Sequence, residues 1–203
     1  DQMRSVHGER PSVDLDSPDV RINVYLRNDE ASVAIALAGA SLHERGYRSE
    51  QREAPMKENL AAAILLLADY PKIAAEGGAL VDPMCGSGTL PLEAALIATR
   101  TAPGLFRAES RRKWGFAGWK KHDAALWARL VSHARAARLL DAKKLPKIVG
   151  FDEDSSAIRV ANSNLEAAGL RGLVHFEKRE LADVEPPVGA TRGLFVVNPP
   201  YGE

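Results

Sequence analysis

Cysteine is scarce in this sequence: the chain of 203 residues has a single one, Cys85, so an intrachain disulfide framework is excluded. An unpaired thiol is typical of a reducing compartment, and we therefore expect a cytoplasmic protein. The five histidines are scattered and no Cys-x-x-Cys pair exists, so the sequence predicts no metal site. Apolar runs are all well short of the roughly 20 residues that span a bilayer, and the polar start does not resemble a secretory signal. We expect no membrane partner.

An excess of one charge is also missing, because 27 lysines and arginines balance 27 aspartates and glutamates. The balance excludes a chain that is basic over its whole surface, although a local basic face is still compatible with a nucleic-acid partner. A chain of this length can bury a substantial core, and one domain with an appendage is the natural organisation. The composition indicates no particular oligomeric state.

Residues 80–89, LVDPMCGSGT, look like a short buried strand that breaks into a glycine loop and opens a helix. Gly86 and Gly88 allow a sharp turn and the close approach of a ligand, and Asp82 ends the strand. The amides at the start of the helix favour an anionic group, so a nucleotide-like ligand suits the loop. Pro91 replaces the third glycine of the dinucleotide fingerprint, and no lysine follows Gly88 as a phosphate-binding loop requires. By itself the loop is also compatible with an ordinary strand-to-helix turn.

A second motif, Asn-Pro-Pro-Tyr, follows another apolar strand near the end of the sequence. Asn198 offers a side-chain carbonyl oxygen, and Pro199 and Pro200 hold the backbone so that a carbonyl points outward. Tyr201 adds a flat ring on which a base can stack. A simple turn is the alternative. We expect these four residues to be the catalytic ones.

DPMCGSGT followed by NPPY resembles the S-adenosylmethionine-dependent amino-methyltransferases, which modify exocyclic nitrogens of nucleic-acid bases. A wider set of segments is similar to the THUMP-linked 23S rRNA guanine-N2 methyltransferases of bacteria, among them RINVYLRNDEASVAIALAGASLHERGYR, APMKENLAAAILL, WGFAGWKKHDAALW and NPPYGE. The similarity runs over nearly the whole chain. It implies that S-adenosylmethionine is the methyl donor and that the exocyclic N2 amine of a guanine in 23S rRNA is the acceptor.

The cofactor site is expected at the glycine loop and at the ends of two later strands. Asp152 follows the strand predicted at residues 147–151 and is well placed to accept hydrogen bonds from ribose hydroxyls. Glu180 stands where the resembled family usually has an aspartate that meets the adenine amino group. Cys85 lies inside the loop, which argues against its use as a nucleophile, since a nucleophile must reach the base. The expected set is Asp82, Pro83, Cys85, Gly86, Ser87, Gly88, Thr89, Asp152, Glu153 and Glu180.

Residues 100–122 interleave cations with aromatic rings, a pattern that suits RNA because phosphates meet the charges and unstacked bases meet the rings. In the alternative, the tryptophans pack the loop down while the charges stay solvated. We favour packing for Trp114 and Trp119 and leave both interpretations open for the cations. The expected RNA-binding residues are Arg107, Arg111, Arg112, Lys113, Lys120 and Lys121.

Strand and helix segments alternate after residue 57, which predicts an α/β fold with a doubly wound, mostly parallel sheet and helices on both of its faces. The strands are expected near residues 80–82, 147–151, 173–177 and 193–197, the helices at 57–68, 89–98, 123–139 and 155–168, and a hairpin at 20–27 and 32–38. The resemblance implies a Rossmann-like class I methyltransferase, truncated after its fourth strand. It assigns residues 1–45 to the end of a THUMP-like RNA-binding region with its linker and residues 46–203 to a methyltransferase domain that is incomplete at its C-terminus.

Two other functions stay open. The NPPY motif also occurs in adenine-N6 DNA methyltransferases, although the hairpin and the WGFAGWKKHD segment favour rRNA. A non-catalytic RNA-binding scaffold with this fold is the second alternative, and the intact Asp82, Gly86, Gly88, Asp152 and Asn198 argue against it.

Overall fold

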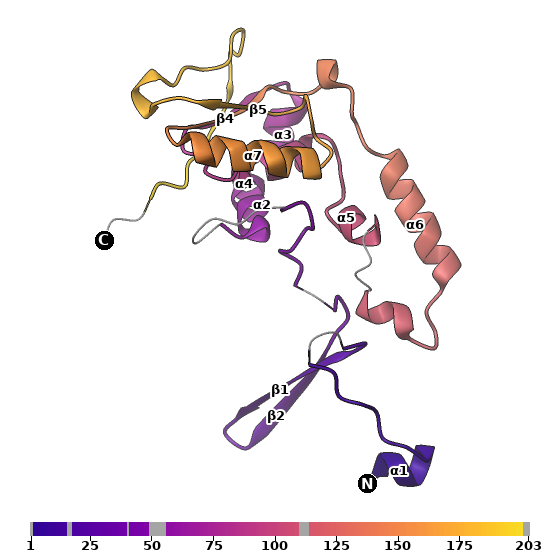
Figure 1. Ribbon diagram of the computed structural model, residues 1–203. Helices are drawn as coiled ribbons and strands as arrows, with labels where there is room; N and C mark the ends of the chain where they lie inside the picture. Colours follow the sequence, from indigo (N-terminus) through magenta and orange to yellow (C-terminus); the bar gives the residue numbers. More distant parts are fainter. Residues whose placement is uncertain (1, 16–17, 40, 49–55, 110–113, 201–203) are drawn as a thin grey trace. The chain divides into compact units, whose positions relative to one another are not determined.

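The computed structural model describes residues 2–15, 18–39, 41–48, 56–109 and 114–200 (Figure 1). The chain divides into two compact units. The first comprises residues 1–41 together with 112–124, and the second comprises residues 42–111 together with 125–203.

The first unit is built on the antiparallel hairpin that the sequence predicts. Strand β1 spans Arg21–Arg27, β2 spans Glu30–Ala36, and a short helix, α1, precedes them at Gln2–His7. The loop has two residues, Asn28 and Asp29, with φ angles of 47° and 61°. These left-handed angles match the twist of a tight hairpin, and Asn and Asp tolerate them better than most residues. The second strand therefore begins two residues earlier than expected.

A 3-10 turn of the same unit, η1 at Gly115–Gly118, contacts the end of the hairpin. The backbone amide of Phe116 donates to the carbonyl of Leu37 at 3.1 Å, and a Cβ on Gly115 would lie 2.6 Å from the carbonyl oxygen of Ala36. Trp114 stacks on Phe116 with ring centroids 5.6 Å apart. Packing is thus confirmed for Trp114, whereas it is wrong for Trp119, which is 46% exposed because it lies beyond the turn.

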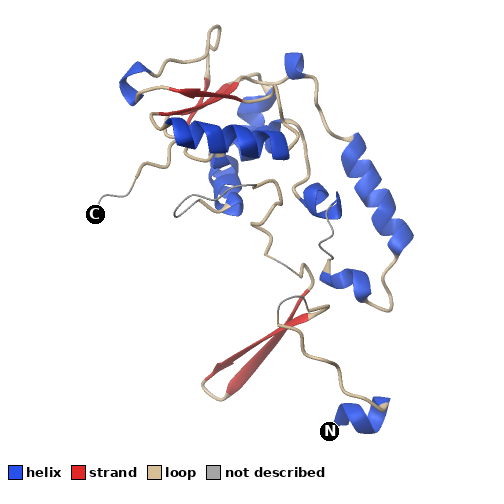
Figure 2. Cartoon of the chain, in the orientation of Figure 1, coloured by secondary structure: helices blue, strands red, loops and turns tan. Residues whose placement is uncertain are grey.

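The second unit contains a four-stranded parallel sheet, in the order β5-β4-β3-β6. Its strands are β3 at Ala79–Asp82, β4 at Ile148–Asp152, β5 at His175–Lys178 and β6 at Gly193–Phe195. Strands are red and helices blue in Figure 2. The chain moves outward from β3 to β4 and β5, then returns to the other side of β3 as β6. This reversal creates a switch point between β3 and β6, and in open α/β sheets ligands bind at such a point, beside the carboxyl ends of the strands. The predicted α/β class and parallel sheet are confirmed.

The core lies on one face of this sheet. Helices α2 (Glu58–Leu67), α3 (Tyr70–Ala75), α4 (Thr89–Ala98) and α7 (Ser155–Ala167) supply buried residues to a single apolar cluster. Leu80, Ile148 and Phe176 join that cluster from the strands. Two further α-helices among the described residues are α5 at Gly104–Glu109 and α6 at Ala124–Ala136. No helix among the described residues has the length and apolar character needed to cross a membrane.

The opposite face of the sheet is covered more thinly. Val81, Val149 and Phe151 form a small cluster there, with half-buried Val184 against it. The expectation of helices on both faces is therefore met on one face only within the described part of the chain. The crossovers from β3 to β4 and from β4 to β5 run in the same direction across the sheet. Because parallel crossovers are right-handed, both place their helices on the same face of the sheet. The single reversed crossover, from β5 to β6, carries the short turn η3 (Leu181–Asp183) in place of an α-helix.

Candidate functional site

The two sequence motifs meet at the switch point of the sheet. Asp82 ends β3, and β6 pairs with β3 as its parallel neighbour. The pairing continues past β6, because the amide of Val196 donates to the carbonyl of Val81 at 3.0 Å. Asn198 follows two residues later and is half-buried, while Pro199 and Pro200 are exposed. Tyr201, the fourth residue of the motif, lies outside the described residues.

The glycine loop needs both of its glycines, for different reasons. Gly86 and Gly88 have φ angles of 53° and 81°, which strain any residue with a side chain. A Cβ on Gly88 would also lie 2.7 Å from the ring of Phe176 and 3.2 Å from Ala161, whereas a Cβ on Gly86 would meet nothing within 4 Å. Gly88 thus lets the loop pack on the core, whereas a Cβ on Gly86 would point into open space.

Asp152 braces the glycine loop from the end of β4. One carboxylate oxygen accepts the backbone N–H of Gly86 at 2.9 Å, and the other accepts the N–H of Asp154 at 3.0 Å. The sequence assigns Asp152 to the ribose hydroxyls. Each carboxylate oxygen has a second lone pair, so the brace and a contact with hydroxyls are compatible.

Asp82 is a buried carboxylate, 1% exposed, at the end of the central strand β3. Burial raises its pKa from 3.8 to about 7, and the nearby charge of Asp152 acts in the same direction. The N–H of Met84, which donates to the carboxylate at 3.2 Å, opposes that rise. No ion-pair partner of Asp82 is found within the described ranges. A buried carboxylate whose pKa is raised in this way suits a cationic group of a ligand, because a nearby positive charge favours the ionised carboxylate.

Cys85 and Ser87 fill the inner side of the loop, and both side chains are buried. Burial raises the pKa of the Cys85 thiol far above its ordinary value, and the charges of Asp82 and Asp152 add to the effect. A thiol held in its protonated form is a poor nucleophile. This agrees with the exclusion of a cysteine nucleophile.

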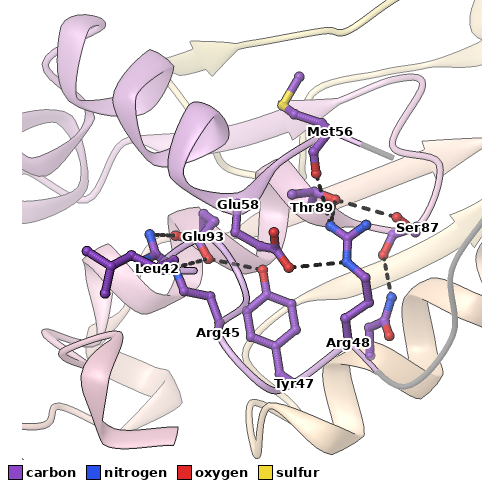
Figure 3. Close-up of polar contacts among 10 residues, drawn as sticks. Leu42, Arg45, Tyr47, Arg48, Met56, Glu58, Ser87, Thr89 and Glu93 are labelled. Atoms are coloured by element: carbon purple, nitrogen blue, oxygen red, sulfur yellow. Dashed lines mark hydrogen bonds and ion pairs between the residues drawn. The ribbon is translucent and has the colours of Figure 1, made fainter. Parts of the chain in front are cut away.

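Two side chains that the sequence reasoning missed also hold the loop, and one of them, Arg48, is labelled in Figure 3. Asn164 on α7 donates through Nδ2 to the carbonyl of Ser87 at 3.1 Å, and Arg48 donates through Nη2 to Oγ1 of Thr89 at 3.1 Å. Asn164 is 1% exposed and lies on the buried stripe of α7 with Ala157 and Ala161. A polar residue on an apolar stripe is a signal that could have identified Asn164. Arg48 carries no comparable signal.

The other expected cofactor residues have different surroundings. Pro83 is buried, while Glu153 and Glu180 are exposed. Glu180 precedes the turn η3, and the amide of its neighbour Arg179 donates to the carbonyl of Asp152 at 3.0 Å. Glu180 thus lies beyond the end of β5, two strands away from the glycine loop in the order β5-β4-β3.

The expected RNA-binding residues are only partly described. Arg107 is 7% exposed on α5, so the structure places it in the interior, where it does not suit a phosphate contact. Lys120 and Lys121 are exposed. The three remaining cations lie outside the described residues: Arg111, Arg112 and Lys113. Within the described ranges, no group of three or more His, Cys, Asp or Glu residues is arranged to hold a metal ion.

Two protein families match the chain. The family of RMKL-like methyltransferase domains matches residues 45–203, and the THUMP domain family matches residues 1–36. The ribosomal RNA large subunit methyltransferase K/L of Allochromatium vinosum is 53% identical over all 203 residues, which cover 27% of that protein. The same enzyme of Syntrophotalea carbinolica is 51% identical and is covered to 28%. The chain thus spans about a quarter of the length of these curated relatives.

Solved structures match the fold as well. The crystal structure of SMU.472 in complex with SAH is 36% identical with a TM-score of 0.80, over 100% of this chain and 50% of that one. A protein from Listeria monocytogenes described as a predicted N6-adenine-specific DNA methylase is 36% identical with a TM-score of 0.76, over 91% of this chain and 45% of that one.

Proposed function

The chain belongs to the family of RMKL-like methyltransferase domains, and from this premise we propose that it transfers a methyl group from S-adenosylmethionine to the N2 amine of a guanine in 23S rRNA. The observation that carries the proposal is the meeting of the glycine loop and the Asn-Pro-Pro motif at the switch point between β3 and β6. The rRNA substrate is supported by the names of the two relatives that share about half of the residues of this chain.

The residues at the loop fit the chemical groups of S-adenosylmethionine. The buried carboxylate of Asp82 suits the ammonium group of the methionine moiety, and Asp152 suits the ribose hydroxyls. The free amides at the start of α4, beginning at Thr89, suit the carboxylate. When bound, the cofactor supplies an electrophilic methyl group on a positively charged sulfur. We assign Pro83, Cys85, Gly86, Ser87 and Gly88 to the walls of the same site, and Glu153 and Glu180 to the side of the ribose and adenine.

Asn198 and Pro199 act on the acceptor nitrogen in this proposal. The lone pair of the guanine amine is delocalised into the ring, which makes the amine a poor nucleophile. The side-chain oxygen of Asn198 and the carbonyl of Pro199 accept its two N–H bonds, which favours a pyramidal nitrogen and aims its lone pair at the methyl group. Asn198 cannot take up a proton, so the extra proton leaves to solvent after transfer. Pro200 stiffens the motif, and Tyr201 stacks on a base flipped out of its stem.

The remaining assignments follow from the same premise. We propose that residues 1–45 are part of a THUMP-like RNA-binding region with its linker and that residues 46–203 form the methyltransferase domain. Lys120 and Lys121 are the exposed candidates for phosphate contacts among the described residues. The proposed rRNA substrate supports a cytoplasmic location.

A methyl-transfer assay on the full-length protein tests the substrate. Radiolabelled S-adenosylmethionine is offered with 23S rRNA that lacks its native modification, and DNA serves as the competing substrate. The proposal predicts label on guanine in rRNA. Label on adenine in DNA would favour the second candidate function, an adenine-N6 DNA methylase, which the description of the Listeria monocytogenes protein supports.

A further inference from the structure

Residues 42–48, which we call the segment before α2, reach the buried carboxylate of Glu93 on α4 (Figure 3). Arg45 donates to both oxygens of Glu93, from Nε at 3.4 Å and from Nη2 at 3.2 Å, and the hydroxyl of Tyr47 donates to Oε1 at 3.0 Å. Tyr47 and Glu93 are both buried. Burial and the charge of Glu93 raise the pKa of Tyr47 well above its ordinary value, so its hydroxyl stays protonated and remains a donor.

Arg48 makes a second bridge, between the starts of two helices. Its Nη2 donates to the carbonyl of Met56 at 3.0 Å and to Oγ1 of Thr89 at 3.1 Å. Its Nε lies 3.2 Å from the carboxylate of Glu58 on α2, an ion pair without the alignment of a hydrogen bond. The side chains of Arg48 and Glu58 are 9% and 5% exposed. A guanidinium this deeply buried is stabilised only by such partners, so its geometry is fixed.

Thr89 links Arg48 to the glycine loop. Its Oγ1 lies 3.4 Å from the hydroxyl of Ser87, and the carbonyl of Ser87 accepts from Asn164 at 3.1 Å. Side chains from three places therefore hold the loop: Asn164 on α7, Asp152 on β4 and Arg48 in the segment before α2. Arg48 provides the last of these contacts.

We propose that Arg48 is a positioning residue of the methyl-donor site: it fixes the start of α4, and with it Ser87 and Thr89, so that the segment before α2 sets the affinity for the cofactor. This inference rests on the proposed function. Thr89 and Glu93 are four residues apart and share one face of α4, so Arg45 anchors the same helix one turn beyond the loop. Arg45 therefore provides a matched control.

The test measures binding of S-adenosylhomocysteine by calorimetry in the full-length protein. Arg48→Met is expected to weaken binding about tenfold and to raise the KM for the cofactor, with kcat at saturating cofactor nearly unchanged. Arg45→Met removes an ion pair of similar burial, so it is expected to lower the thermal midpoint comparably while leaving the Kd within about twofold of the parent. Equal changes of Kd in the two variants, or none in Arg48→Met, would overturn the inference.

A double-mutant cycle separates positioning from general loss of stability. Thr89→Val removes the acceptor of Arg48, and its effect on Kd should be clearly less than additive with that of Arg48→Met. Arg48→Lys keeps the charge beside Glu58 but loses the planar fork, so an intermediate Kd is expected, and this variant serves if Arg48→Met does not fold. Additive effects in the cycle, or a parental Kd in Arg48→Lys and Thr89→Val alike, refute positioning. Failure of the parent itself to bind would instead count against the proposed function.

Discussion

Replacement of Asp82 by asparagine is expected to make the ligand-free protein more stable above neutral pH. Burial raises the pKa of Asp82 from 3.8 to about 7 in the folded chain. A carboxyl group with a raised pKa contributes full stability below its unfolded pKa and loses that contribution as the pH rises through the folded value. The shift corresponds to about 4 kcal/mol in total, of which about 3 kcal/mol is lost between pH 5 and pH 8. Asparagine carries no charge, so this loss disappears.

Amide hydrogen exchange read by mass spectrometry provides the assay, on peptides that cover β3 and α4 and after correction for intrinsic exchange rates. The opening free energy of the parent should fall from pH 5 to pH 8, and that of Asp82→Asn should fall much less. Burial also raises the pKa of Glu93, and the pH dependence that results from Glu93 is common to both proteins. Glu166→Gln, which alters an exposed carboxylate on α7, is the control and should follow the parent. A parallel decline in parent and Asp82→Asn would refute the reasoning. Asp82→Asn should also bind S-adenosylhomocysteine at least tenfold more weakly than the parent, because the ammonium group of the ligand loses its partner.

Three further predictions test the loop and the RNA surface. Asp152→Ala should weaken cofactor binding by about 1–3 kcal/mol and speed exchange of the Gly86 amide, because a half-buried charged acceptor is lost; an unchanged affinity in calorimetry would remove Asp152 from the site. Gly88→Ala should lower the thermal midpoint more than Gly86→Ala, since its Cβ would lie 2.7 Å from a ring carbon of the core as well as at an unfavourable φ; equal midpoints would contradict this account. Lys120→Ala combined with Lys121→Ala should reduce the salt dependence of RNA binding by a slope of up to about 2 and leave the cofactor Kd unchanged; an identical slope would show that both charges are solvated.

Much of the fold followed from local patterns in the sequence. The strands lie within two residues of their expected positions, because short apolar runs bounded by turn residues have few alternatives. The family expected from the resemblance of the wider set of segments is confirmed by the match over residues 45–203. The two motifs lie at one edge because parallel strands align their carboxyl ends.

The parts that the sequence did not predict depend on contacts between distant residues. Arg48 and Thr89 are 41 positions apart, and Asn164 and Ser87 are 77 positions apart. No periodicity encodes such pairs, so the supports of the loop were missed. Arg107 was assigned to the surface because its segment is basic, yet α5 buries its side chain. The alternation of strands and helices predicts helices on both faces of the sheet. It does not reveal in which direction each crossover runs, and therefore which face each helix covers.

Methyl transfer by Asn198→Ala in the full-length protein tests the central claim most directly. Asn198 is assigned to the amine being methylated and not to the cofactor, so binding of S-adenosylhomocysteine should stay within about twofold of the parent. Transfer of label to 23S rRNA should fall by about 10²-fold or more, the scale that follows removal of one hydrogen bond made in the transition state. Transfer at the parental rate by a variant that still binds the cofactor would contradict the account.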